Sequence, residues 1–207
     1  MDKRPETIID IQSMIPSIVA EIRYYSADNF IGAPIDGYLA PKIFLSIPAC
    51  RALEKAQSML ARFDLGLKVY DAYRPQMSVD HFIRWSQDER DIKMKAVYYP
   101  ELDKKDLFNQ GFVASKSSHS RASTVDVTLV SLSSPFFQEL DMGTIWDYFH
   151  PASWTHYNKL THDQRANRML LQQVMSHVGF TGLSQEWWHF TLKQEPFPNT
   201  YFNFPIE

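Results

Sequence analysis

The 207-residue sequence has little of several features that define other classes of protein. Its one cysteine, Cys50, cannot form an intramolecular disulfide, and its place on the apolar side of an expected helix favours a buried thiol over a zinc ligand. No stretch approaches the roughly 18 apolar residues of a membrane-spanning helix, so no membrane partner is expected. Residues 1–10 are charged and lack the apolar core of a signal peptide. We therefore expect a cytoplasmic protein, or a periplasmic one if a signal peptide has been removed.

An excess of positive charge is also missing. The formal net charge is -3, and no cluster of Lys and Arg is interleaved with aromatic residues, so nucleic acid is not an expected partner. The sequence has no repeat, low-complexity tract or linker, and 44% of its residues are hydrophobic. A chain of this length and composition predicts a single domain, residues 1–207, with a sizeable core.

Hydrophobic periodicity predicts both helices and strands. Residues 46–64 and 161–178 show helical spacing, and Thr161 with Gln164 forms a capping box. The inward residues are expected to be Cys50, Leu53, Ala56, Leu60 and Phe63 in the first helix, and Met169, Leu170, Val174 and Val178 in the second. A further short helix is expected to begin at Pro75 and strands over residues 67–73, 124–130 and 186–192. We predict an α+β fold with a mixed or antiparallel central sheet flanked by helices.

Two distant segments together indicate a zinc site. His119 and Asp126 lie seven residues apart, and Glu186 precedes His189 by three. Two imidazoles and a carboxylate can hold Zn²⁺ and leave one position open for water, while a second carboxylate can act as general base. Asp126 lies within an apolar, β-branched run, where an ionised group needs a partner or a metal. Spacing alone leaves open that Asp126 is a solvent-facing residue of a strand.

The sequence resembles the VanX-type D-alanyl-D-alanine dipeptidases. The wider zinc peptidase superfamily has S-x-H-x-x-G-x-A-x-D followed by a distant E-x-W-H, which this sequence matches at Ser117, His119, Asp126, Glu186, Trp188 and His189. Further matching segments are residues 28–30, 36–38, 71–75, 111–115, 141–143 and 195–205. The resemblance extends over nearly the whole chain and implies a hedgehog/DD-peptidase-like fold.

The resemblance implies a role for each residue of the motif. His119, Asp126 and His189 would hold one Zn²⁺ per chain, Glu186 would accept a proton from water, and Arg74 would stabilise the oxyanion. The alternative for Glu186 is a carboxylate at the rim that pairs with a surface lysine, but its position next to His189 and the resemblance favour the catalytic role. For Arg74, spacing alone favours an ion pair with Asp71 that holds the end of a strand, and only the resemblance favours the catalytic role.

Substrate recognition is also implied by the resemblance. Asp147 lies at the family's position for the residue that binds the substrate ammonium, and Tyr24 and Ser117 match residues that contact substrate. Trp187 and Trp188 are expected to form a wall of the pocket. Side-chain preferences leave open that Tyr24 and the tryptophans belong to the core and that Ser117 caps a loop.

Two residues depart from the superfamily pattern, since its Gly and Ala are Ala122 and Thr124 here. If residue 122 requires a positive φ, alanine costs about 1 kcal/mol or more and shifts His119 relative to Asp126. We favour an ordinary backbone at Ala122, because all three ligand types are kept.

The expected activity is zinc-dependent hydrolysis of D-alanyl-D-alanine to two D-alanines, in removal of a cell-wall precursor or in peptidoglycan recycling. The partner would be this small dipeptide, and a homo-oligomer is possible. One alternative is a D-alanyl-D-alanine carboxypeptidase or endopeptidase that acts on peptidoglycan stems. Another is a non-catalytic zinc-binding interaction domain of the same fold.

Overall fold

The computed structural model describes residues 2–109 and 114–207, so the matching segment 111–113 lies outside the described residues. The strands are β1 (Ile8–Asp10), β2 (Val19–Ala20), β3 (Phe44–Ser46), β4 (Leu65–Asp71), β5 (Thr124–Ser131), β6 (Phe180–Leu183) and β7 (Glu186–Leu192). The α-helices are α1 (Ile47–Ala61), α2 (Gln76–Gln87), α3 (Lys95–Tyr98), α4 (Lys104–Asn109) and α5 (His162–His177). Short 3-10 helices are η1 (Ile11–Ser13), η2 (Arg23–Tyr25), η3 (Ser118–Arg121) and η4 (Pro151–Ser153).

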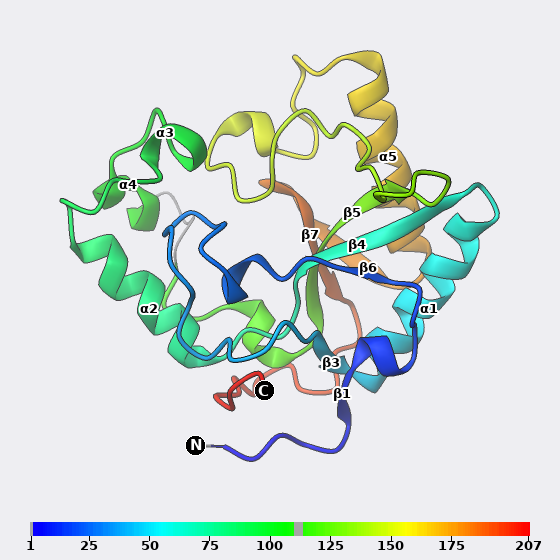
Figure 1. The fold of residues 1–207 in the computed structure, drawn as a ribbon, viewed down its shortest axis with the longest axis horizontal. Coiled ribbons are helices and arrows are strands. Elements are labelled where there is room, and N and C mark those ends of the chain that lie inside the picture. Colours follow the sequence, from blue (N-terminus) through cyan, green and yellow to red (C-terminus); the bar gives the residue numbers. More distant parts are fainter. Residues whose placement is uncertain (1, 110–113) are drawn as a thin grey trace.

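A five-stranded sheet in the order β2-β4-β5-β7-β6 forms the centre of the molecule (Figure 1). β2 is parallel to β4, and the other neighbouring pairs are antiparallel. β1 and β3 form a separate antiparallel pair. The prediction of an α+β fold with a mixed sheet is therefore confirmed.

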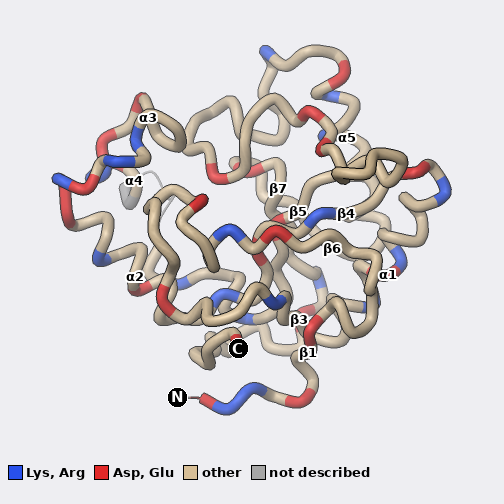
Figure 2. The backbone as a smooth tube through the Cα atoms, viewed as in Figure 1, with Lys and Arg blue, Asp and Glu red and all other residues tan. Residues whose placement is uncertain are grey.

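The helices form two groups on different sides of the molecule. α1 and α5 pack against the sheet and against each other, whereas α2, α3 and α4 lie together at the left of Figure 1. Charges of both signs are interspersed along the chain in Figure 2. None of the helices in the described ranges combines the length and apolarity needed to span a bilayer.

The two long helices occupy nearly the expected ranges, but one inward residue in each prediction is wrong. Phe63 follows the last turn of α1 and is 74% exposed, because the helix ends before its side chain can turn inward. Met169 is 61% exposed, since the buried face of α5 is formed by Leu171, Val174 and Met175. The predicted capping box at the start of α5 is confirmed.

Strand register explains how distant residues meet on the three inner strands of the sheet. Asp71 of β4 is paired with Asp126 of β5, and Asp126 is paired with His189 of β7. A register shift between Val69 and Asp71 interrupts the β4–β5 ladder just before this row. Irregularities of this kind re-aim side chains next to functional sites. Three polar residues from three adjacent strands thus lie side by side.

Candidate metal centre

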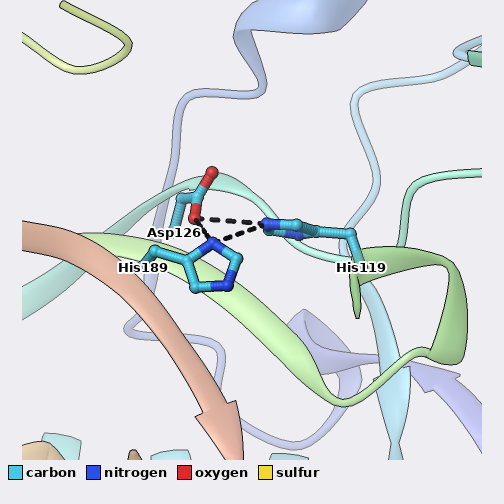
Figure 3. A group of neighbouring side chains, drawn as sticks. All are labelled: His119, Asp126 and His189. Atoms are coloured by element: carbon cyan, nitrogen blue, oxygen red, sulfur yellow. Dashed lines mark hydrogen bonds and ion pairs between the residues drawn. The ribbon is translucent and has the colours of Figure 1, made fainter. Parts of the chain in front are cut away.

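His119, Asp126 and His189 converge on one point (Figure 3). Nε2 of His119 lies 3.3 Å from Oδ1 of Asp126, and Nδ1 of His189 lies 3.2 Å from the same oxygen. The two imidazole nitrogens are 3.2 Å apart. One nitrogen from each ring and one carboxylate oxygen all lie within 4.8 Å of one another. The structure therefore brings together the three residues that the sequence separates by up to 70 positions.

The carboxylate of Asp126 is buried, so it is not a solvent-facing residue of the strand. It is 1% exposed, and its Oδ2 accepts a hydrogen bond of 3.2 Å from the indole Nε1 of Trp146. Its Oδ1 is buried and has no hydrogen-bond partner in the described structure. Burial alone would raise the pKa of Asp126, but the imidazoles of His119 and His189 outweigh burial and hold the pKa well below its usual range. An ionised oxygen therefore faces both imidazoles.

Hydrogen bonds orient both imidazole rings. Nδ1 of His119 donates to the carbonyl oxygen of Ala72 at 2.6 Å, which leaves Nε2 as an acceptor facing the cluster. Nδ1 of His189 faces the cluster, and its Nε2 lies 3.3 Å from the hydroxyl of Ser118. Each ring thus presents one nitrogen to the shared point and uses the other for support.

The backbone between the first two of these residues is strained, which corrects the expectation of an ordinary backbone. Ala122 has φ 58° and ψ 30°, a left-handed conformation in which glycine is favoured over alanine. Its amide donates to His119, and its carbonyl accepts from the amide of Ser46 at 2.7 Å. Thr124, the second departure, is buried, and its hydroxyl lies 2.9 Å from that of Thr191 on the neighbouring strand. Both substitutions are accommodated without separating the ligands.

Glu186 lies beside the cluster at the start of β7. Its Oε2 is 3.5 Å from Nδ1 of His189, and its side chain is 20% exposed. Burial raises the pKa of Glu186, an effect that His189 only partly offsets. Within the described ranges its ion-pair partner is this histidine rather than a lysine. A partly exposed carboxylate with a raised pKa can accept and return a proton near neutral pH.

Arg74 follows β4 and faces the same cavity. Its Nε donates to Oδ2 of Asp71 at 2.9 Å, and one of its terminal nitrogens lies 3.8 Å from Oδ2 of Asp126. The guanidinium also lies over the rings of Tyr24 and Phe82. Arg74 therefore forms the ion pair with Asp71 that the sequence left open, and this pair fixes Arg74 at the edge of the cavity. A fixed guanidinium stays charged at every working pH.

These side chains line a cavity of about 250 Å³. The sequence did not predict the apolar wall of the cavity, which consists of Phe30, Val79, Phe82, Phe149 and Leu183. Nor did it predict Lys116 at the mouth of the cavity. Their only sequence signal is apolar spacing or position next to a motif, which core and surface residues share.

Asp147 and Tyr24 meet in this cavity. The hydroxyl of Tyr24 donates to Oδ2 of Asp147 at 2.6 Å, and Asp147 has a positive φ of 57°. Burial, aided by the nearby charge of Asp126, raises the pKa of Asp147 well above its usual range. Ser117 also lines the cavity, and its hydroxyl accepts from the amide of His119, so it caps η3 as well.

Trp187 and Trp188 do not line this cavity, which corrects the expectation that they form its wall. They are 2% and 1% exposed, and the indole Nε1 of Trp187 donates to the hydroxyl of Thr144 at 2.8 Å. The guanidinium of Arg168 lies over the ring of Trp187. Trp187 thus packs between the sheet and α5, in the core.

A convergent His-Asp-His cluster beside a carboxylate and a fixed arginine, on the central strands of a mixed sheet, can hold a metal ion and is the arrangement expected of a metallopeptidase. The comparisons with known proteins give the family. The chain belongs to the Peptidase M15 family, described as D-ala-D-ala dipeptidase, whose family model matches residues 4–207.

Several curated relatives carry the name D-alanyl-D-alanine dipeptidase. One from Streptomyces coelicolor is 40% identical over 196 residues, covering 95% of this chain and 96% of the relative. One from Enterococcus faecium is 34% identical over 197 residues, with the same coverage of both chains. One from Escherichia coli is 31% identical over 187 residues, covering 90% of this chain and 85% of the relative.

Proposed function

We propose that this protein is a zinc-dependent dipeptidase that hydrolyses D-alanyl-D-alanine to two D-alanines. The observation that carries the proposal is the buried Asp126 Oδ1, which lacks a hydrogen-bond partner and faces the ring nitrogens of His119 and His189. The names of the relatives support the substrate. The 207 residues would form one catalytic domain, and a cytoplasmic location stays a prediction.

The donor set fits zinc. Two imidazole nitrogens and one carboxylate oxygen are the ligands of catalytic zinc sites that keep a fourth position open. His119, Asp126 and His189 would hold the ion, with His119 oriented by the carbonyl of Ala72. Bound zinc would polarise the scissile carbonyl and make water acidic enough to react near neutral pH.

Glu186 would move the proton. Its carboxylate accepts a proton from the attacking water and transfers it to the nitrogen of the leaving D-alanine as the peptide bond breaks. The raised pKa of Glu186, caused by burial, brings this carboxyl closer to the pH at which both transfers occur. Arg74 would stabilise the negative charge that develops on the carbonyl oxygen, because its guanidinium is already held by Asp71.

Asp147 would bind the substrate ammonium. A free dipeptide carries a positive charge at its amino end, and Asp147 is the buried acid that accepts a hydrogen bond from Tyr24 within the cavity. An ammonium placed there favours the ionised carboxylate and compensates for its burial. The cavity of about 250 Å³ lies below the ~300–1,000 Å³ of pockets for drug-sized ligands and suits a small substrate.

The test is D-alanine release by zinc-loaded protein from three substrates: D-alanyl-D-alanine, its N-acetyl derivative and L-alanyl-L-alanine. We expect release from the free D,D-dipeptide. Glu186→Gln should lower kcat by roughly 10²–10⁴-fold and keep the zinc. The matched control is Glu54→Gln, an exposed carboxylate on α1. Equal cleavage of the N-acetyl substrate would indicate a carboxypeptidase, and no release despite bound zinc would indicate a non-catalytic zinc domain.

A further inference from the structure

The cavity holds charges of both signs in addition to the metal ligands. Asp147 and Glu186 supply negative charge, and Arg74 and Lys116 supply positive charge. The substrate proposed above is a zwitterion, so its carboxylate needs a cation just as its ammonium needs Asp147. The two ends of an extended dipeptide lie about 7 Å apart, within the reach of a small cavity.

Arg74 is not free to bind the substrate carboxylate. It is 12% exposed and is held by Asp71 at 2.8 Å from its terminal nitrogen. The same guanidinium lies 3.8 Å from Asp126 and over the ring of Tyr24. These contacts place its positive charge beside the metal ligands and the ammonium-binding residues, where the reaction takes place.

Lys116 is in a different situation. Its side chain is exposed at the mouth of the cavity, and its Nζ lies 4.7 Å from the centre of the Tyr201 ring. Arg121, which also lies over the Tyr201 ring, takes both carboxylate oxygens of Glu195, at 2.8 Å and 2.7 Å. In the part of the chain that the structure describes, Lys116 therefore faces an aromatic ring and has no carboxylate partner.

The backbone around Lys116 is held in place by hydrogen bonds, whereas within the described ranges its ammonium group has only the contact with the Tyr201 ring. The carbonyl of Ser115 accepts from Nε2 of Gln76 at 3.0 Å, and the hydroxyl of Ser117 caps η3. The carbonyl of Ser120 accepts from the amide of Phe202 in the C-terminal segment. A lysine on a fixed backbone, whose ammonium lies over an aromatic ring and has no carboxylate partner in the described residues, can offer its charge to an anion at the cavity mouth.

We propose that Lys116 binds the C-terminal carboxylate of the substrate and thereby selects free peptides of dipeptide length. The inference rests on the proposed function, since it assigns the second charge of the same substrate. Asp147 and Lys116 would then recognise the two ends of the zwitterion, and Arg74 would act between them on the scissile bond.

The test compares D-alanyl-D-alanine with its C-terminal amide in the wild type, Lys116→Met and Lys116→Arg. For the free acid, Lys116→Met should raise KM roughly fivefold at low salt, the size expected of an exposed ion pair, and leave kcat nearly unchanged. The amide should be turned over alike by the wild type and Lys116→Met. Lys116→Arg should keep most of the preference for the acid, because the charge remains.

Salt and a control variant give independent readouts. The KM of the wild type for the acid should rise with ionic strength, and this dependence should be smaller in Lys116→Met. Lys193→Met is the matched control, since Lys193 is an exposed lysine in a separate cleft beside Gly179, and it should behave like the wild type.

An equal effect of Lys116→Met on the acid and the amide, or no effect on either, would overturn the assignment. If the wild type releases no D-alanine from the dipeptide, the failure lies in the proposed function itself. If the wild type is active but Lys116→Met affects the acid and the amide equally, the dipeptidase proposal stands and Lys116 does not bind the substrate carboxylate.

Discussion

The two halves of the candidate site are positioned in different ways. The metal half rests on strand register, because Asp126 and His189 are directly paired across β5 and β7. The half that carries Asp147 lies in the long connection between β5 and α5, whose only helical segment in the described structure is η4. Ladder hydrogen bonds fix Asp126 and His189, whereas the connection that carries Asp147 is held by side-chain contacts and by isolated backbone hydrogen bonds, such as the one from the amide of Phe149 to the carbonyl of Tyr98.

Arg168 supplies the main contacts of this second half. It projects from α5, is 2% exposed, and donates to the carbonyls of Met142, Ala152 and Trp154 at 2.7, 2.9 and 2.7 Å. Burial lowers the pKa of Arg168 to about 10, so it stays charged at neutral pH. One buried side chain thus holds the connection on both sides of Asp147. The comparison predicts that Asp147 can be displaced without separating His119, Asp126 and His189.

The largest effect is expected from Arg168→Met, which removes the hydrogen bonds that hold the connection carrying Asp147. The loss of donors to three carbonyls, of which that of Met142 is buried, should lower the free energy of unfolding by about 3 kcal/mol. Displacement of Asp147 should lower kcat/KM for the dipeptide roughly ten- to hundredfold. Zinc content, measured by mass spectrometry, should stay at one per chain.

The control is Arg165→Met, an exposed arginine one turn earlier on α5, which should change neither quantity. A parallel loss of zinc in Arg168→Met would contradict the separation of the two halves.

Asp147→Asn tests the second half of the site through the pH dependence of protein stability. The folded-state pKa of Asp147 is raised, so the folded protein binds a proton more tightly than the unfolded chain, and its stability falls as pH rises above the ordinary pKa of about 3.9. Asparagine does not titrate and can still accept from Tyr24. In metal-free protein, the variant should match the wild type below about pH 4 and exceed its Tm by about 2–4 °C at neutral pH. The KM for the dipeptide should rise.

Asp141→Asn provides a control of opposite sign. Hydrogen bonds from Gln164 and from the amide of Gly143 lower the pKa of Asp141, so its ionised form stabilises the fold above the ordinary pKa. This variant should therefore have a lower Tm than the wild type at neutral pH. Equal pH profiles for the two variants, measured by thermal unfolding, would refute the burial argument for Asp147.

The smallest effect is expected in the metal half, from Ala122→Gly. Glycine adopts the left-handed backbone of this position without steric strain, so the variant should be more stable by about 0.5–1 kcal/mol in chemical denaturation. Ala56→Gly, in the middle of α1, should be less stable by about 1 kcal/mol. Both alanine methyl groups are buried, so a loss of stability in Ala122→Gly as large as that in Ala56→Gly would show that Ala122 is not strained.

The sequence predicted most of the fold and the three residues that converge in the candidate metal centre. Long helices and the strand bearing Asp126 follow from periodicity, and the ligand residues follow from their types together with the family resemblance. Strand register was not readable, so the row of Asp71 with Asp126 and the ring of Trp146 were missed. The same limit explains the wrong placement of Trp187, because an aromatic residue beside a ligand suits a core as well as a pocket wall.

The backbone conformation of Ala122 and the aromatic wall of the cavity could not be predicted from the sequence either. The positive φ of Ala122 depends on the turn between η3 and β5, and the departure from glycine gave only a hint of it. The cavity wall, formed by Phe30, Phe82 and Phe149 from three separate segments, requires tertiary structure to assemble.

The most direct test of the central claim is zinc affinity and D-alanine release measured together for the wild type and Asp126→Asn. We expect the wild type to bind one zinc ion per chain, release to follow zinc occupancy, and the variant to bind zinc more than roughly a hundredfold more weakly. Asp163→Asn, an exposed carboxylate on α5, should match the wild type. Wild-type protein that binds no zinc, or an Asp126→Asn variant that binds zinc and releases D-alanine normally, would contradict the account.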